Sequence, residues 1–148
     1  MNPILLTSVA AWLIAQVGKV VVAWIRTRTV ELRLLTTTGG MPSAHSALVA
    51  SLTVGVGLAE GTGSPVFAVA FVFSMIVFYD AAGVRRAAGE QAEVLNQMLR
   101  DLYIDHEFRP ERLRELLGHT PVEVLAGIGL GGLLAWTGWL LGRGAPGG

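Results

Sequence analysis

The sequence predicts an all-α integral membrane protein, a four-helix bundle of membrane spans with a cytoplasmic amphipathic helix between spans three and four. Three observations favour this class. Hydrophobic residues make up 52% of the chain and charged residues 15%, and the mean hydropathy is +0.56, so the chain is more apolar than a soluble domain. The apolar residues form four long segments, and most charged residues lie between them. At 148 residues the chain is one domain, residues 1–148.

The first apolar segment, residues 3–25, is predicted to span the membrane. At about 1.5 Å per residue it is long enough to cross a hydrocarbon core of roughly 30 Å. Only Met1 and Asn2 precede it, and neither carries a positive charge. We therefore expect a membrane helix rather than a cleaved signal peptide.

Two shorter apolar segments follow, at residues 41–59 and 65–82. Each is near the lower length limit for a span, about 17 residues, so we expect short or tilted helices. A pair of glycines precedes the first of these segments. Pro42 suits the first turn of a helix that begins near Met41.

The rest of the chain, from residue 84, combines a polar excursion with a fourth span. Residues 84–118 hold many arginines and carboxylates. The apolar residues of 87–103 recur at helical spacing, which predicts an amphipathic helix outside or along the membrane. Thr120 and Pro121 suit the N-cap and the first residue of a span over residues 121–141.

The positive charges predict the orientation. Nine of the eleven Lys and Arg residues lie in residues 26–33 or 85–114, which are on the same side of a four-span arrangement. By the positive-inside rule this side is cytoplasmic, and both termini are outside. The net charge is zero, so the sequence does not indicate a nucleic-acid partner. The lack of cysteine excludes disulfides and thiolate metal sites.

Four spans of alternating direction bring the unusual polar residues to the cytoplasmic side. A helix that begins near Met41 has an electropositive N-terminus, which binds phosphate readily. Charged residues within spans are costly and mark functional sites. Together with His45 and His119, these features predict a pocket for a phosphate group. Its members are Lys19, Arg26, Ser43, His45, Asp80, Arg85, Arg86, His119 and Glu123.

Two simpler interpretations remain open at this point. Lys19 could pair with Asp80 as a structural ion pair. The glycines and Pro42 could form only a turn that caps a helix, with His45 as an ordinary polar residue at the membrane surface.

Three motifs of this chain resemble a known superfamily. Lys19-x6-Arg26, Pro42-Ser43-Ala44-His45 and His119-x3-Glu123 resemble the three-part motif of the type 2 phosphatidic acid phosphatases, a superfamily that includes vanadium-dependent haloperoxidases. GGMPSAHSA, FYDAAGVRRAAGEQAEVLN and LLGHTPVEVLAG look closer to its divergent branch, a small bacterial and plastid membrane family. The resemblance covers nearly the whole chain.

The resemblance implies a membrane phosphatase that hydrolyses a lipid or isoprenoid phosphate monoester at the cytoplasmic face of a bacterial inner membrane. It implies that His45 is the general acid, that His119 is the nucleophile that forms a phosphohistidine, and that Glu123 holds His119. It implies no metal or other cofactor. The implied phosphate ligands are Lys19, Arg26, Ser43, Ala44 and either Arg85 or Arg86.

The chain also departs from the superfamily pattern. Glu123 stands where the pattern has aspartate, and Arg86 and His119 lie much farther apart than the corresponding pair. Arg100 and His106 have the usual spacing and form a rival placement, in the most polar segment of the chain.

Three further alternatives are kept. Asp80, Glu90 and Glu93 could bind Mg²⁺ near a phosphate, although the two glutamates also suit a solvated helix face. The protein could instead bind or transport a phospholipid or polyprenyl phosphate without turning it over. The glycines from Gly127 to Gly132 lack the preceding strand of a dinucleotide fingerprint and suit close helix packing, including a possible homodimer through span four.

Overall fold

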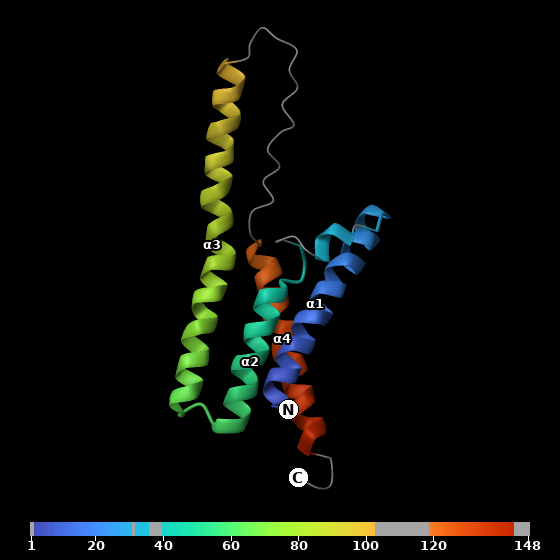
Figure 1. Cartoon of the computed structure of the whole chain (residues 1–148), viewed down its shortest axis with the longest axis vertical. Coiled ribbons are helices and arrows are strands. Elements are labelled where there is room, and N and C mark those ends of the chain that lie inside the picture. The colour runs from blue at the N-terminus through green and yellow to red at the C-terminus, as the bar shows by residue number, and fades with distance from the viewer. Residues whose placement is uncertain (1, 31, 36–39, 103–118, 144–148) are drawn as a thin grey trace.

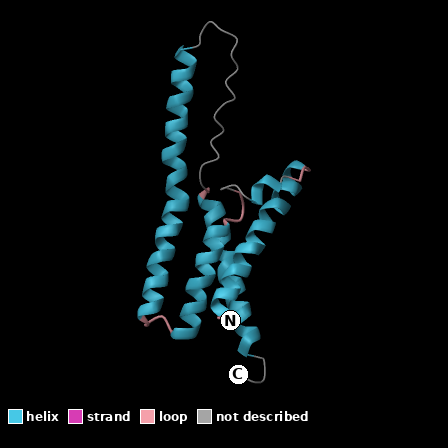
Figure 2. Cartoon of the chain, viewed as in Figure 1, coloured by secondary structure: helices cyan, strands magenta, loops and turns pink. Residues whose placement is uncertain are grey.

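The protein is all-helical over the residues that the structure describes. This structure is a computed structural model, and it describes residues 2–30, 32–35, 40–102 and 119–143. Figure 2 shows helices and loops, and no strand, in these ranges. The elements in chain order are α1 (Pro3–Thr27), the short 3₁₀ helix η1 (Leu32–Leu35), α2 (Ala44–Glu60), α3 (Pro65–Leu102) and α4 (Pro121–Arg143) (Figure 1).

The sequence predicted the start of α4 correctly but placed the start of α2 too early. Helix α4 begins at Pro121, as expected, and Thr120 caps it, because its Oγ1 accepts the Glu123 amide at 3.2 Å. Helix α2 begins three residues later than predicted, at Ala44. Pro42 is therefore not in the first turn. Ser43 is the N-cap, and its hydroxyl oxygen accepts the Ser46 amide at 3.3 Å.

Helix α3 corrects the predicted boundary after the third span. It continues unbroken for 38 residues, so the segment predicted as a separate amphipathic helix, residues 87–103, belongs to α3 as far as Leu102. Figure 1 shows the second half of α3 extending well beyond the ends of the other helices. The rest of the predicted excursion, residues 103–118, lies outside the described residues.

Helices α2 and α4 run parallel and form the closest pair. A Cβ built at Gly127 would collide with the Ser43 carbonyl oxygen, and one built at Gly131 would collide with that of Ala47. These glycines are one turn apart on α4, and their partners are one turn apart on α2. The glycines therefore form a close packing surface, as predicted, but within the chain. A homodimer through α4 would have to use another face, such as that of Gly129, whose built Cβ has no neighbour within 4 Å.

Helices α1 and α3 lie on opposite sides of this pair. Helix α1 packs on α2 and α4, whereas α3 packs mainly on α2, and α1 and α3 make no contact in the described ranges. The core is built from small residues: Ala11, Ala15, Ala44 and Ala47 are completely buried. Small residues let helix backbones approach closely, which is typical of membrane helices. The described residues form four α-helices where four spans and a separate amphipathic helix were predicted, and α3 is a flanking helix rather than an equal member of a bundle.

Among the described residues, two helices are long and apolar enough to cross a membrane by length and composition. They are Pro3–Thr27 and Pro121–Gly142, while Ala44–Glu60 and the first part of α3, Pro65–Ala81, are apolar but shorter. Large apolar side chains are exposed along α1, α3 and α4. In water such a surface would favour aggregation, whereas in a bilayer it faces lipid. Some of them are Leu5, Leu13, Val17, Val69, Phe73, Ile76, Leu125, Leu133 and Leu141.

Candidate functional site

Two histidines meet where α2 and α4 begin. The ring centroids of His45 and His119 lie 6.3 Å apart, with the ring planes at 61°. His45 is exposed in the first turn of α2, and His119 is 3% exposed just before α4. The His119 amide donates to the Ala81 carbonyl of α3 at 3.1 Å. Three helices therefore position this pair.

Glu123 connects His119 to the helix around it. Its Oε2 lies 3.4 Å from His119 Nδ1 and accepts the Thr120 amide at 2.8 Å. The Glu123 carbonyl accepts the Ser43 amide at 2.9 Å, which ties α4 to the N-cap of α2. The contact with the imidazole is longer than an ideal hydrogen bond. It leaves His119 Nε2 on the side of the ring away from the carboxylate.

Lys19 is buried near Glu123 and His119. It is 2% exposed in α1, and its Cγ would be 3.5 Å from a Cβ built at Gly40. Its charge interacts with those of Glu123 and His119. Asp80, the ion-pair partner considered from the sequence, is exposed. Glu123 is thus a charge partner of Lys19.

The electrostatic surroundings favour a neutral His119. Burial is the largest cause that lowers its pKa from the ordinary value of 6.5, and the positive charge of Lys19 lowers it further. Glu123 acts in the opposite direction, and His45 contributes a smaller lowering. Neither ring nitrogen of His119 makes a hydrogen bond within the described part of the protein. A neutral imidazole with an unpaired Nε2 is a nucleophile or a base.

Ser43 and Ala44 lie directly beside the histidines, and both are completely buried. The Ser43 hydroxyl oxygen accepts two hydrogen bonds, from the Ser46 amide and from the Ser46 hydroxyl at 2.9 Å. Ser43 therefore caps the start of α2, whereas the simpler interpretation from the sequence assigned the cap to the glycines and Pro42.

Of the predicted cations other than Lys19, only the side chain of Arg26 lies among the described residues. Arg26 is exposed in the last turn of α1. The side chains of the other predicted residues on α3, and the whole of His106, lie outside the described structure. These side chains are Arg85, Arg86, Glu90, Glu93 and Arg100. No group of three metal-ligating side chains occurs among the residues that the structure describes.

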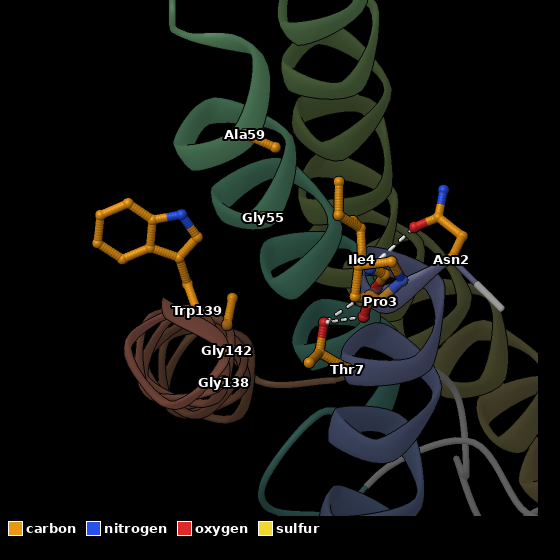
Figure 3. Close-up of a pocket in the computed structure, with 10 residues that line it drawn as sticks. Asn2, Pro3, Ile4, Thr7, Gly55, Ala59, Gly138, Trp139 and Gly142 are labelled. Carbon is orange, nitrogen blue, oxygen red and sulfur yellow. Dashed lines mark hydrogen bonds between the residues drawn. The ribbon is translucent and has the colours of Figure 1, made fainter. Parts of the chain in front are cut away.

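A separate pocket of about 540 Å³ lies at the other end of α1, α2 and α4 (Figure 3). Its lining is mostly apolar and contains no charged side chain, so this pocket is separate from the charged groups around the histidine pair. Asn2, Pro3, Ile4, Thr7, Gly55, Ala59, Ala135, Gly138, Trp139 and Gly142 line it.

Sequence reasoning missed three features of the site. They are the role of the Ala81 carbonyl, the Ser43 backbone as the partner of Gly127, and the reciprocal hydrogen bonds of Thr120 and Glu123. The last had a sequence signal, because Thr-x-x-Glu before an apolar run is a capping-box pattern.

Fold and site together define a helical membrane protein with a histidine pair, a buried lysine and a half-buried carboxylate at one end. The particular family follows from comparison: the chain belongs to the Divergent PAP2 family, whose model matches residues 1–134. YuiD of Bacillus subtilis (strain 168), an uncharacterized membrane protein, is 45% identical over 141 residues, which are 88% of this chain and 89% of the relative. Together with the two long apolar helices, this relative supports a membrane location. No solved structure matches the chain.

Proposed function

We propose that the protein is a membrane phosphatase that hydrolyses a lipid or isoprenoid phosphate monoester through a phosphohistidine. The observation that carries the proposal is the 6.3 Å separation of the two imidazole rings. At this separation one phosphate group lies within reach of both rings, so one imidazole attacks phosphorus while the other serves the leaving oxygen.

The orientation of His119 supports one choice of reacting atoms in this proposal. Nδ1 faces Glu123, so Nε2 attacks phosphorus and the bond to the alkoxide oxygen breaks. His45 donates its proton to that oxygen, which releases the alcohol. Water then attacks the phosphohistidine, and His45 takes one proton from it. The products are the alcohol and inorganic phosphate, and both histidines return to their starting states.

The charges of the site support an anionic substrate. Parallel packing places the N-termini of α2 and α4 side by side, and each carries a partial positive charge. Lys19 adds its ammonium group, and Glu123 partly offsets these charges. In this proposal the Ala44 amide, the Ser43 hydroxyl, Lys19, Arg26 and either Arg85 or Arg86 contact the phosphate oxygens. Transition-state charge on those oxygens is stabilised without a metal.

The proposed setting is a bacterial inner membrane. The helices form four spans, two of them short or tilted, and the site faces the cytoplasm with the arginine-rich second half of α3. A lipid phosphate diffusing in the inner leaflet would present its head group at this level.

Phosphate release tests the proposal. Purified protein in detergent is expected to release phosphate from phosphatidic acid, phosphatidylglycerophosphate or a polyprenyl phosphate without Mg²⁺, and vanadate is expected to block the release. His119→Ala should abolish it. His106→Ala is the matched control and should retain it. Loss of release on chelation, or in His106→Ala alone, would refute this mechanism in favour of Mg²⁺ at Asp80, Glu90 and Glu93 or of the Arg100 and His106 placement.

One observation favours a second function, the binding or transport of a phosphorylated lipid without turnover. Both ring nitrogens of His119 are buried, so a substrate reaches Nε2 only if the surrounding side chains move. Binding of the lipid phosphates without release, unchanged in His119→Ala, would establish this function instead.

A further inference from the structure

One carboxylate oxygen of Glu123 contacts both the N-cap of α4 and the ring of His119. Its Oε2 accepts the Thr120 amide at 2.8 Å and lies 3.4 Å from His119 Nδ1. Thr120 completes the pair, since its Oγ1 accepts the Glu123 amide at 3.2 Å. This reciprocal arrangement is a capping box, with Thr120 as N-cap and Glu123 at the third helical position.

The position of His119 makes the capping box relevant to chemistry. His119 directly precedes the N-cap, so its side chain and the returning carboxylate of Glu123 meet at the start of the helix. A carboxylate oxygen has enough lone pairs to accept the Thr120 amide and still present a lone pair to the imidazole 3.4 Å away. The two hydrogen bonds of the capping box therefore hold the oxygen that the imidazole faces.

We propose that Thr120 is a positioning residue for His119, acting through Glu123, and that the carboxylate at this position must be a glutamate to do both tasks. The returning side chain of a capping box is Glu or Gln, because it must reach back to the N-cap amide. Aspartate is shorter by one carbon–carbon bond, about 1.5 Å. The glutamate that departs from the superfamily's aspartate is then explained by its place in the first turn of α4.

The catalytic part of this inference rests on the proposed function, whereas the positional part does not. The test therefore needs a measurement on His119 that requires no turnover. The chain has three histidines, so histidine-selective isotope labelling gives three imidazole signals in detergent. His45→Ala and His106→Ala identify two of them, and the third is His119.

The groups facing His119 determine the sign of the expected shift. Among the described residues they are Lys19 from α1, His45 from α2 and Glu123 from α4, while α3 presents the Ala81 carbonyl and Asp80 is exposed. Glu123 alone raises the pKa of His119 among these charges. Loosening Glu123 therefore lowers the pKa of His119 further and removes the preference for a proton on Nδ1.

The chain contains a matched control for the capping energy. Ser64-Pro65-Val66-Phe67 at the start of α3 parallels Thr120-Pro121-Val122-Glu123, and Ser64 Oγ accepts the Phe67 amide at 3.2 Å. The control segment has no carboxylate at the third position and no histidine before the cap. Ser64→Ala thus removes a cap of the same type without touching the site.

The experiment compares four variants of the full chain in detergent. Thr120→Ala is expected to lower the His119 pKa and to reduce kcat about 10- to 100-fold, and Thr120→Ser is expected to restore both. Ser64→Ala should change neither. Glu123→Asp keeps the charge but should shift the His119 titration in the same direction as Thr120→Ala. It also tests the inference if Thr120→Ala does not fold.

Two results would overturn the inference. One is a Thr120→Ala protein whose His119 titration and tautomer match wild type. The other is a Glu123→Asp protein that is indistinguishable from wild type. A shifted titration in a protein that releases no phosphate would retain the positioning role and reject only the proposed function.

Discussion

Replacing Gly127 by alanine is expected to separate α4 from α2 and to disrupt the site. A Cβ at this position would meet the Ser43 carbonyl oxygen and would lie 2.9 Å from Ser46 Cβ, whereas ordinary contact begins at 3.4 Å. The obstacle is backbone, so the helices must move apart by half an ångström or more. The 2.9 Å hydrogen bond from the Ser43 amide to the Glu123 carbonyl lies in the same contact and would lengthen.

The cost of this change follows from two opposing terms. Overpacking a tight contact costs roughly 1–3 kcal/mol, and replacing a glycine inside a helix returns at most about 1 kcal/mol. We expect Gly127→Ala to lower the free energy of unfolding by about 1–2 kcal/mol. The His45 and His119 rings would also move apart, so phosphate release should fall more than stability does.

Two glycines of the same helix serve as controls for Gly127→Ala. Gly129→Ala has open space around its Cβ and should match or exceed wild-type stability. Gly131→Ala collides with the Ala47 carbonyl one turn deeper, so it should lose stability with a smaller effect on release. Denaturation in detergent measures the first quantity and a phosphate assay the second. Equal stability of the Gly127→Ala and Gly129→Ala proteins would refute the packing argument.

Three further outcomes are expected. His45→Ala should abolish turnover and leave the free energy of unfolding within about 1 kcal/mol of wild type, because the side chain is exposed; a large loss of folded protein would show a structural role. Gly40→Ala should cost about 1–2 kcal/mol in unfolding experiments, because its φ is +91°, while Gly63→Ala, with open space, should cost little. Since burial lowers the pKa of His119 below 6.5, the unfolded chain binds a proton more readily, so stability should be complete above about pH 6.5 and fall as the pH drops toward the folded value. His119→Asn should remove this dependence of stability on pH. If the dependence persists in that variant, its assignment to His119 is wrong.

Local signals predicted the start of α4, whereas composition misplaced the end of α3. Thr120 and Pro121 predicted the start of α4 because capping is a local property of the backbone. The change from apolar to charged residues near Val84 suggested the end of a helix, yet α3 continues to Leu102. Composition reports the surroundings of a helix, whereas a helix ends only where its hydrogen bonding is interrupted. No proline interrupts this stretch.

The proximity of the two histidines could be predicted from the sequence. His45 and His119 each stand at the start of an apolar segment, and alternate spans run in the same direction, so their starts share one side. The spacing of residues along the sequence does not give the rotation of each helix about its own axis. For that reason the sequence offered Asp80 as the partner of Lys19, whereas the charge of Lys19 interacts with Glu123. The same rotation decides that Gly127 and Gly131 face α2.

The parallel packing of α2 and α4 has an electrostatic consequence for what the site holds. Adjacent parallel helices place like partial charges together, about half a positive charge at each N-terminus. With the ammonium of Lys19 buried beside them, the positive charge of these described groups exceeds the negative charge of the Glu123 carboxylate. A phosphate monoester carries up to two negative charges and complements this excess, whereas Mg²⁺ would add to it. Binding of vanadate should therefore weaken in Lys19→Met, and should be retained when chelators are present. Vanadate affinity that is unchanged in Lys19→Met would refute this charge argument.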